Sequence, residues 1–206
     1  GRPQTTAPAA EPPPAGSRNT QLIREWRYIG HFSRVYSLFE RPSGLTLIHN
    51  PRAVGRMRYE GFLDALNNSE TLSQEEIIAV AFETEVTTTA RLEALLPTLK
   101  QCGIQVTEFG RQFYRIEAVP SFIDGEMARQ LIMDWIRSDD ESSISGDQMR
   151  LQLAKIGANS RATRLSLPVP KEEAFAILRD LLDCEQPMVD PTGKPIVHHL
   201  PHRWFE

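Results

Sequence analysis

The chain has 206 residues, of which 40% are hydrophobic and 24% charged, and its formal net charge is −4 at pH 7. This length and composition are typical of one globular domain, or of one domain built from two small lobes. The weakly acidic balance gives no support for non-specific binding of nucleic acid through a basic shell, and it leaves room for a local basic patch.

The two cysteines, Cys102 and Cys184, are isolated in the sequence. They form no CxxC pair and no framework of the secreted type, which indicates a reducing compartment, and we interpret both as small buried residues. No stretch approaches the roughly 18 consecutive apolar residues of a membrane span. The first residues also lack the basic and apolar segments of a signal peptide. The sequence therefore predicts a cytoplasmic protein without a membrane segment.

Residues 1–19 contain no Leu, Ile, Val or aromatic residue and are rich in proline and alanine. Such a segment cannot bury a core, so it is predicted to be a disordered, partly polyproline linker. Its place at the start of the chain favours a larger segment upstream, and a simple floppy terminus is the alternative.

The first third of the ordered chain predicts a hairpin followed by a helix. The β-branched and aromatic residues between Trp26 and Glu40 favour a strand buried on both faces. The turn signal Arg41-Pro42-Ser43-Gly44 leads into a second strand, Leu45–His49. Apolar residues three to five positions apart then favour a helix from about Ala53 to Leu66, which Asn67-Asn68-Ser69 ends.

The middle of the chain alternates strands and helices. A strand is expected at Ile77–Phe82, and a helix is expected after the threonine run 87–89, despite Pro97 within it. Gly103 is a natural stop for this helix. A second hairpin, joined at Gly110, and another helix follow, and a polar loop is expected over 139–146. The two strands are Ile104–Phe109 and Phe113–Val119, and the helices bury Leu92, Leu95, Leu96 and Leu99 in the first and Met127, Leu131 and Trp135 in the second.

Two more helices and a short strand are expected in the last third. The second of these helices opens at Pro170, with acidic residues near its positive end. A turn at Asp190-Pro191-Thr192-Gly193 precedes a last strand, Pro195–His199. The mixture of hairpins and helices predicts an α+β, or mixed α/β, fold. The helices are expected to bury Met149, Leu153 and Ile156 in the first and Phe175, Leu178, Leu181 and Leu182 in the second.

Several local patterns occur in a fixed order between Arg27 and Phe205. In this order and spacing, the chain resembles the C-terminal dimerisation domain of bacterial MutL DNA mismatch-repair proteins. The patterns are Arg27–Phe32, Tyr36–Glu40 and Gly44–Ile48 at the start, Leu95-Leu96-Pro97, Cys102-Gly103-Ile104, Phe109-Gly110 and Ala118-Val119-Pro120 in the middle, and Asp190-Pro191-Thr192-Gly193-Lys194-Pro195 near the end.

The resemblance implies two lobes and a set of partners. An outer lobe, residues 20–76 and 148–206, would form a homodimer, and residues 77–147 would form an inner, regulatory lobe. An ATPase domain is implied upstream of the linker. The full-length protein is expected to contact the mismatch-recognition protein MutS and the sliding clamp, with weak or indirect DNA contact, and no cofactor is expected. The candidates for the dimer interface are Val35, Leu47, Phe175, Leu178 and Leu182.

Many family members carry Asp-Gln-His-Ala, two residues, Glu, four residues and Glu directly after the second strand. With later cysteine and histidine residues, these carboxylates hold a divalent metal ion for phosphodiester cleavage. Here Glu60 is the one ligand that survives. Glycine has no ligating side chain, and asparagine and threonine are poor ligands. The other degenerate positions hold His49, Gly55, Asn159, Asp190 and Thr192.

Arg52 and Arg56 add positive charge where a metal ion would lie. We therefore predict a domain without endonuclease chemistry, and the alternative is a divergent nicking endonuclease whose rebuilt site uses His49, Glu60 and Asp190. Glu60 itself is interpreted as a solvated helix residue in an exposed ion pair. A third hypothesis is an unrelated, monomeric α+β ligand-binding domain.

Two further motifs have an ordinary structural interpretation beside the functional one. His198, His199 and His202 form an HHxxH cluster, but neighbouring strand residues point to opposite faces, which favours structural or surface histidines over metal ligands. Gln74, Ile77 and Ile78 lie where the family places a Gln-x-x-aliphatic motif that docks on the sliding clamp. The two isoleucines could equally begin a core strand.

Overall fold

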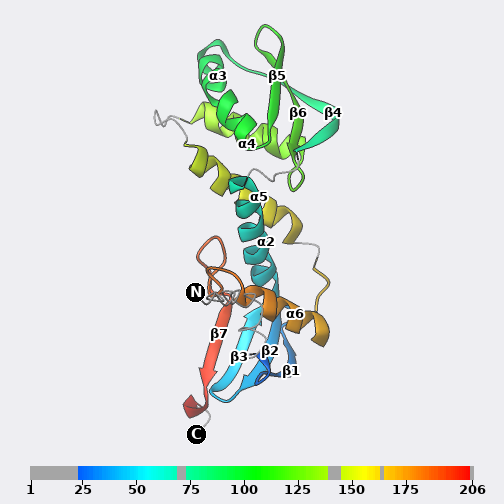
Figure 1. The fold of residues 1–206 in the computed structure, drawn as a ribbon, viewed down its shortest axis with the longest axis vertical. Coiled ribbons are helices and arrows are strands. Elements are labelled where there is room, and N and C mark those ends of the chain that lie inside the picture. The colour runs from blue at the N-terminus through cyan, green and yellow to red at the C-terminus, as the bar shows by residue number, and fades with distance from the viewer. Residues whose placement is uncertain (1–22, 69–72, 139–144, 163–164, 205–206) are drawn as a thin grey trace, which may run out of the picture.

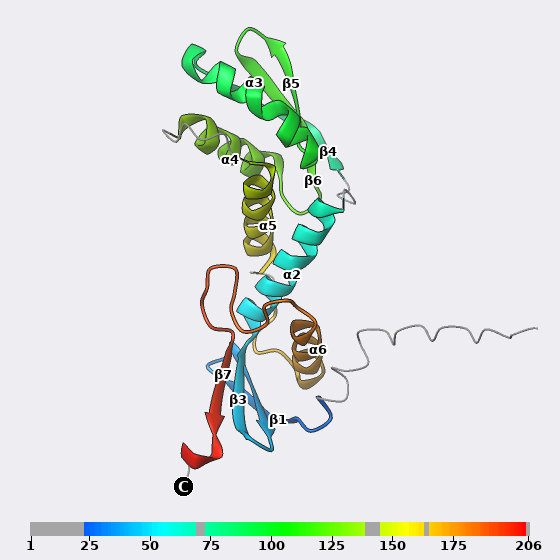
Figure 2. The same cartoon turned by 60° about the vertical axis from the view of Figure 1, so that its left-hand side comes forward.

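The computed structural model describes residues 23–68, 73–138, 145–162 and 165–204, and for 73–79 and 160–162 it describes the backbone alone. The linker expected at residues 1–19, and most of the loop expected at 139–146, lie outside these residues. The described chain forms an elongated molecule with one sheet at each end (Figures 1 and 2). It has five helices and two antiparallel sheets among the described residues, so the expectation of an α+β fold is confirmed.

The lower sheet has the strand order β1-β2-β3-β7. Its four strands are β1 (Arg27–Phe32), β2 (Tyr36–Arg41), β3 (Gly44–His49) and β7 (Val197–Pro201), and a short 3₁₀ helix, η1 (His202–Trp204), follows. Three strands come from the first quarter of the chain and one from its end, so this sheet joins segments about 150 residues apart in the sequence. The expected hairpin is confirmed as β2 and β3.

The single strand expected from Trp26 to Glu40 was wrong in two respects. A tight turn at Ser33 and Arg34, with φ of 50° and 60°, divides it into β1 and β2. Neither residue is the glycine or asparagine that usually marks a left-handed turn, so the sequence gives no local signal for it. Burial along β2 alternates, with Ser37 and Phe39 fully buried between half-buried neighbours, so the strand has one buried face and not two.

The upper sheet has the order β4-β6-β5 and is covered on one side by α3 and α4 (Figure 1). The second hairpin is confirmed, with its first strand ending at Gly110 and its second beginning at Phe113. The helix stop at Gly103 is also confirmed, and this residue has φ of 81°. The helix expected after the threonine run instead begins before it, at Val86, because the threonines form its first turn. The elements are β4 (Ser73–Glu83), α3 (Val86–Gln101), β5 (Gln105–Gly110), β6 (Phe113–Pro120) and α4 (Gly125–Arg137).

Two long helices, α2 (Asn50–Asn67) and α5 (Gly146–Ala162), connect the two sheets (Figure 2). They pack closely where Gly157 of α5 meets the stacked rings of Phe62 and Phe122, whose centroids are 4.2 Å apart. A Cβ atom at position 157 would lie 2.4 Å from Phe122, so glycine permits this contact. The last helix, α6 (Lys171–Leu182), begins one residue after Pro170, which caps it, and lies against the lower sheet.

The buried residues form two clusters, and α2 contributes to both. The larger cluster fills the upper sheet and helices α3 to α5, and it includes Tyr59 and Leu66 of α2. The smaller one packs α6 and the start of α2 onto one face of the lower sheet, through Phe39 and Ile48. The physical division between the two halves of the molecule therefore crosses α2. Among the described residues no helix is long and apolar enough to cross a membrane.

Candidate functional site

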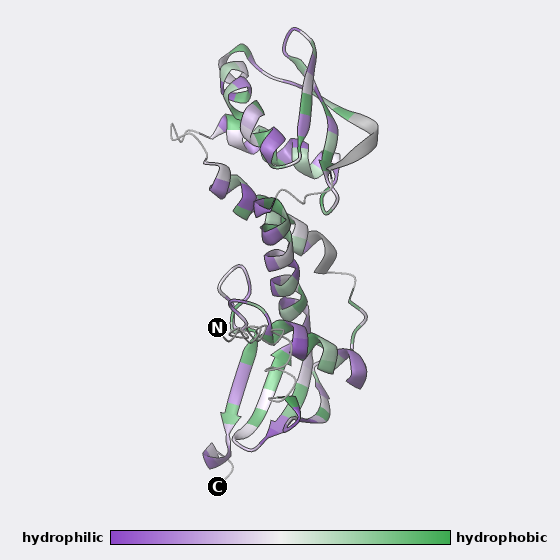
Figure 3. Cartoon of the chain, in the orientation of Figure 1, coloured by the Kyte–Doolittle hydropathy of each residue, from purple (hydrophilic) through white to green (hydrophobic). Residues whose placement is uncertain are grey.

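The opposite face of the lower sheet is open. The strand register places its outward side chains in three rows across the sheet, and four leucines at its centre belong to neither buried cluster. Among the described residues no helix packs on this face, and hydrophobic residues occur along its strands (Figures 2 and 3). We call this surface the open face; its rows are Phe32, Tyr36 and His49, then Gly30, Leu38, Leu47 and His198, then Arg27, Glu40, Leu45 and Leu200.

The candidates for the dimer interface lie on different surfaces. Leu47 is at the centre of the open face. Leu178 is 1% exposed and packs in the core against the inner face of the sheet. Because it has no surface to offer a partner, its choice as an interface residue was wrong. Phe175 and Leu182 are partly buried beside the same core, and Val35, in the turn just before β2, is partly buried without belonging to that core.

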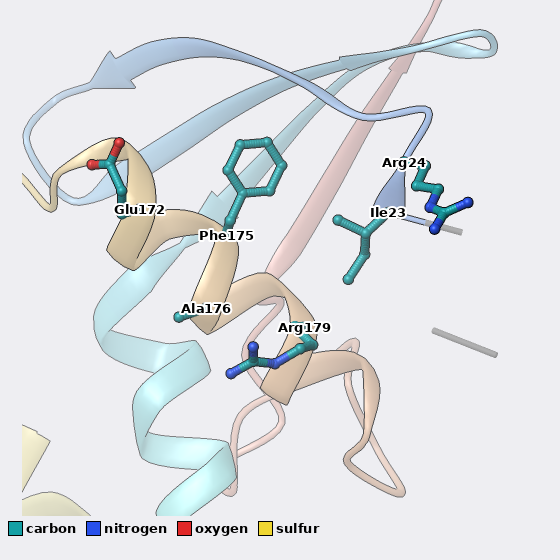
Figure 4. Close-up of a pocket in the computed structure, with 6 residues that line it drawn as sticks. All are labelled: Ile23, Arg24, Glu172, Phe175, Ala176 and Arg179. Carbon is teal, nitrogen blue, oxygen red and sulfur yellow. The ribbon is translucent and has the colours of Figure 1, made fainter. Parts of the chain in front are cut away.

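Phe175 also borders a hollow on the outside of α6, drawn in Figure 4. Its ring packs edge-on against Phe39, with centroids 5.3 Å apart, so the side chain is shared between the core and this hollow. Arg24 and Arg179 lie at one end of the hollow, and Glu172 lies at the other (Figure 4). This surface is separate from the open face, because α6 covers the other side of the sheet.

Side chains at several of the degenerate metal positions make hydrogen bonds that hold the local structure. His49 ends β3 and caps α2, where its Nδ1 accepts a hydrogen bond of 3.3 Å from the amide of Arg52. Burial and the nearby Arg52 charge lower the pKa of His49 below its ordinary value. The neighbouring Asn50 is fully buried and exchanges hydrogen bonds with Ser37, so its amide anchors the helix start to β2.

Asp190 closes the turn that the sequence predicted at 190–193. Its Oδ1 accepts hydrogen bonds from the amide and hydroxyl of Thr192, at 2.8 and 2.7 Å, and from the amide of Lys194 at 2.9 Å. Burial alone would raise the pKa of Asp190, but these hydrogen bonds outweigh it and leave the pKa below its ordinary value. The carboxylate is thus committed to shaping its own loop.

Glu60 is not the solvated residue that the sequence suggested. Its carboxylate accepts hydrogen bonds from the backbone amides of Glu185 and Gln186, at 2.7 and 3.1 Å, and the side chain is only 17% exposed. It also lies 3.6 Å from Arg56, whose side chain is 6% exposed, so the ion pair is largely buried. Burial and the neighbouring Glu60 raise the pKa of Cys184 to about 12, which makes this thiol unreactive.

Arg52, Arg56 and Glu60 together form a stripe at four-residue spacing along α2. Arg56 donates from Nε to the carbonyl of Val189 at 2.7 Å, and Arg52 donates to the carbonyl of Pro195 at 2.9 Å. Arg52 also lies 3.7 Å from Asp190. The stripe therefore fastens residues 185–195 along the helix. Sequence reasoning missed this role, because the bonded partners lie more than 120 positions away.

The remaining degenerate positions do not complete a metal site. Gly55 is buried within α2 and offers no side chain. Asn159 is exposed on α5 and lines a groove with residues of α4, including Met127 and Asp134. Within the described ranges no group of three or more His, Cys, Asp or Glu side chains is placed to hold a metal ion. Both oxygens of Glu60 and Oδ1 of Asp190 accept hydrogen bonds from residues of the 185–194 segment.

The three C-terminal histidines lie in different surroundings. His198 is on the open face, and His199 points to the other side, where its Nδ1 lies 3.1 Å from the carbonyl oxygen of Leu45 and 3.3 Å from the hydroxyl of Thr46. His202 is exposed in η1. The strand itself is Val197–Pro201, two residues later than expected, because Pro195 pairs only as an isolated bridge with Val189.

The clamp-motif candidates lie in β4. Backbone pairing places Gln74 opposite Val119 of β6, and the register shifts between Glu75 and Val80, so the backbone at Ile77 and Ile78 lies in an irregular stretch of the strand. Their side chains lie outside the described part of the structure.

The lower sheet combines strands from the first quarter of the chain with β7 from near its end. Its open face is apolar, and a dimerisation domain needs such a surface for a second copy to cover. Comparison with known proteins agrees. Residues 29–165 match the family described as the MutL C terminal dimerisation domain, and the chain belongs to this family.

The relatives are DNA mismatch repair proteins MutL. The protein from Akkermansia muciniphila is 31% identical over 169 residues, which is 82% of this chain and 26% of the relative. Those from Lactiplantibacillus plantarum and Opitutus terrae are 25% and 29% identical, over 96% and 86% of this chain. The chain spans 26%, 29% and 28% of the length of these three relatives.

Proposed function

We propose that this chain is the homodimerisation and partner-docking domain of a MutL-type mismatch-repair protein, and that two copies associate through the open face. The open face carries this proposal. Four leucines lie in register on a sheet face that no described helix covers. Apolar surface in contact with water does not stabilise a monomer, but it does stabilise a dimer that covers it. The family resemblance implies an ATPase domain upstream, and joining two copies would hold two such domains together.

The size of the face sets how far the interface must extend. Four strands of about six residues cover roughly 20 by 20 Å, or ~400 Å², which is about half of what each partner buries in a standard interface. The interface therefore has to include neighbouring side chains. Two exposed apolar residues lie on β1, Phe32 at 58% within the first row of the face and Ile29 at 46% at the register shift beside it.

Light scattering coupled to size exclusion tests this proposal at micromolar chain concentration. A mass of twice 23.3 kDa supports dimerisation. A monomer of 23.3 kDa that persists as the concentration is raised removes it, and would favour the monomeric ligand-binding alternative.

The same domain is proposed to act without endonuclease chemistry. The observation behind this is that both oxygens of the retained Glu60 accept hydrogen bonds from backbone amides, and that Oδ1 of Asp190 accepts hydrogen bonds within its own turn. We expect no manganese-dependent nicking of supercoiled plasmid at any excess of the chain. Nicking that disappears in Glu60→Gln and Asp190→Asn variants would instead establish the rebuilt site.

Docking on the sliding clamp is proposed for the segment that contains Gln74, Ile77 and Ile78. Its support is the irregular register of β4, which frees several backbone groups there from regular pairing with β6. Binding to an immobilised clamp should be lost in Gln74→Ala, and retention of full affinity would rule the segment out. Contact with MutS is proposed for the full-length protein only.

A further inference from the structure

A histidine, His198, lies on the open face, and one of its ring nitrogens has no hydrogen-bond partner among the described residues. His198 is opposite Leu47 in the register, and its ring meets the Tyr36 ring edge-on, with centroids 6.0 Å apart. Its Nε2 is buried inside the protomer and has no hydrogen-bond partner. A neutral imidazole can leave this nitrogen as an unprotonated acceptor, whereas an imidazolium carries a donor on both nitrogens. A proton on Nε2 would therefore lack an acceptor.

The surroundings of His198 include the charge of Arg52, and the carboxylate that acts on the neighbouring His49, Asp190, is engaged in its own turn. Tyr36 of β2 contacts both His198 and His49, and the His49 ring lies 4.9 Å from the tyrosine ring. The backbone N–H of Arg52, at the start of α2, donates a hydrogen bond to Nδ1 of His49. The Arg52 guanidinium lies 3.7 Å from the Asp190 carboxylate. Among the described residues no carboxylate accepts a hydrogen bond from His198. A positive charge on His198 would add to the positive charge of Arg52 nearby and would find no hydrogen-bond acceptor among the described residues.

We propose that His198 makes association through the open face dependent on pH, so that proton uptake by this imidazole weakens the dimer. This inference rests on the proposed dimerisation through the same face. His198 is only partly buried in the separate chain, so water still reaches the rest of its ring although Nε2 is buried. Covering the face with a second copy removes this remaining water, which is what stabilises an imidazolium that has no acceptor. Neutral His198 loses much less on burial, so dimerisation favours release of its proton.

The expected size follows from linkage. Each dimer contains two copies of His198, so association releases up to two protons when the free chains are protonated. A change from pH 8.0 to pH 6.0 crosses the range in which histidines ordinarily titrate. The dissociation constant should therefore rise roughly tenfold over this interval. General charge effects act in the opposite direction, because pH 6.0 is close to the isoelectric point of about 5.8, where repulsion between chains is weakest.

Sedimentation equilibrium at pH 8.0 and 6.0, at constant ionic strength, tests the proposal. The natural sequence should show the tenfold weakening, and His198→Gln, which keeps a polar side chain without the charge, should lose it. His202→Gln is the matched control, since His202 is exposed in η1 away from the rows of the face. It should keep the full pH dependence.

The outcomes separate this inference from the function on which it rests. A chain that is monomeric at pH 8.0 contradicts the proposed dimerisation itself. A dimer of equal strength at both pH values, or a His198→Gln variant that weakens as the natural sequence does, overturns the role of His198 alone. If His198→Gln fails to fold, the heat of dimer dissociation of the natural sequence, measured near pH 6 in two buffers of different ionisation enthalpy, gives the proton uptake directly. An uptake of zero also overturns the proposal.

Discussion

Replacing Leu47 with glutamate is expected to raise the dissociation constant of the dimer at least about 100-fold while leaving each chain folded. Leu47 lies at the centre of the open face, between Leu38 and His198 in the middle row. A carboxylate there would be buried without a partner on association, which costs several kcal/mol, and about 2.7 kcal/mol already corresponds to 100-fold. In the separate chain Leu47 is only partly buried, so a charge there keeps some contact with water.

Light scattering of Leu47→Glu, with circular dichroism as the test of folding, checks this expectation. Leu38→Glu should behave in the same way, because the two leucines pair directly. Phe109→Glu is the matched control, since Phe109 is a 54% exposed apolar residue on the upper sheet, far from the open face. A folded Leu47→Glu variant that still dimerises as tightly as Phe109→Glu would place the interface elsewhere.

The sequence could identify Leu47 but could not rank it above the residues of α6. Both faces of the lower sheet carry large apolar side chains, with Phe39 and Ile48 on one and Leu38 and Leu47 on the other. Periodicity shows that both faces are apolar, but which one α6 covers is decided by a connection of more than 100 residues. Leu178 was chosen for the interface for this reason, although its side chain completes the inner core.

The elements themselves followed from local patterns more completely than the site did. Helix α2, the hairpins and the stop at Gly103 depend on signals within a few residues, and they were predicted to within a few positions. The turn at Ser33 and Arg34 was missed because its backbone conformation has no sequence signal there. The bonds of Glu60 to residues 185 and 186 were missed because their partner is chosen by the tertiary fold.

Glu60→Ala is therefore expected to lower the free energy of unfolding by about 2–4 kcal/mol, a large share of the stability of a small domain. The substitution leaves two backbone amides without their charged acceptor and leaves the 6% exposed guanidinium of Arg56 without its carboxylate. Arg56 keeps its bond to Val189, which limits the loss. Glu60→Gln keeps a single amide oxygen as acceptor, so it should lose roughly half as much.

Urea unfolding measures these differences, and the Leu47→Glu background keeps the chain monomeric so that stability does not depend on concentration. Asp64→Ala is the matched control, because Asp64 is an exposed carboxylate one turn further along α2, and its change should stay within about 0.5 kcal/mol. If Glu60→Ala loses no more than Asp64→Ala, the carboxylate does not fasten the loop. Glu60 would then be free to act as a ligand, and the rebuilt metal site would become the better account of its retention.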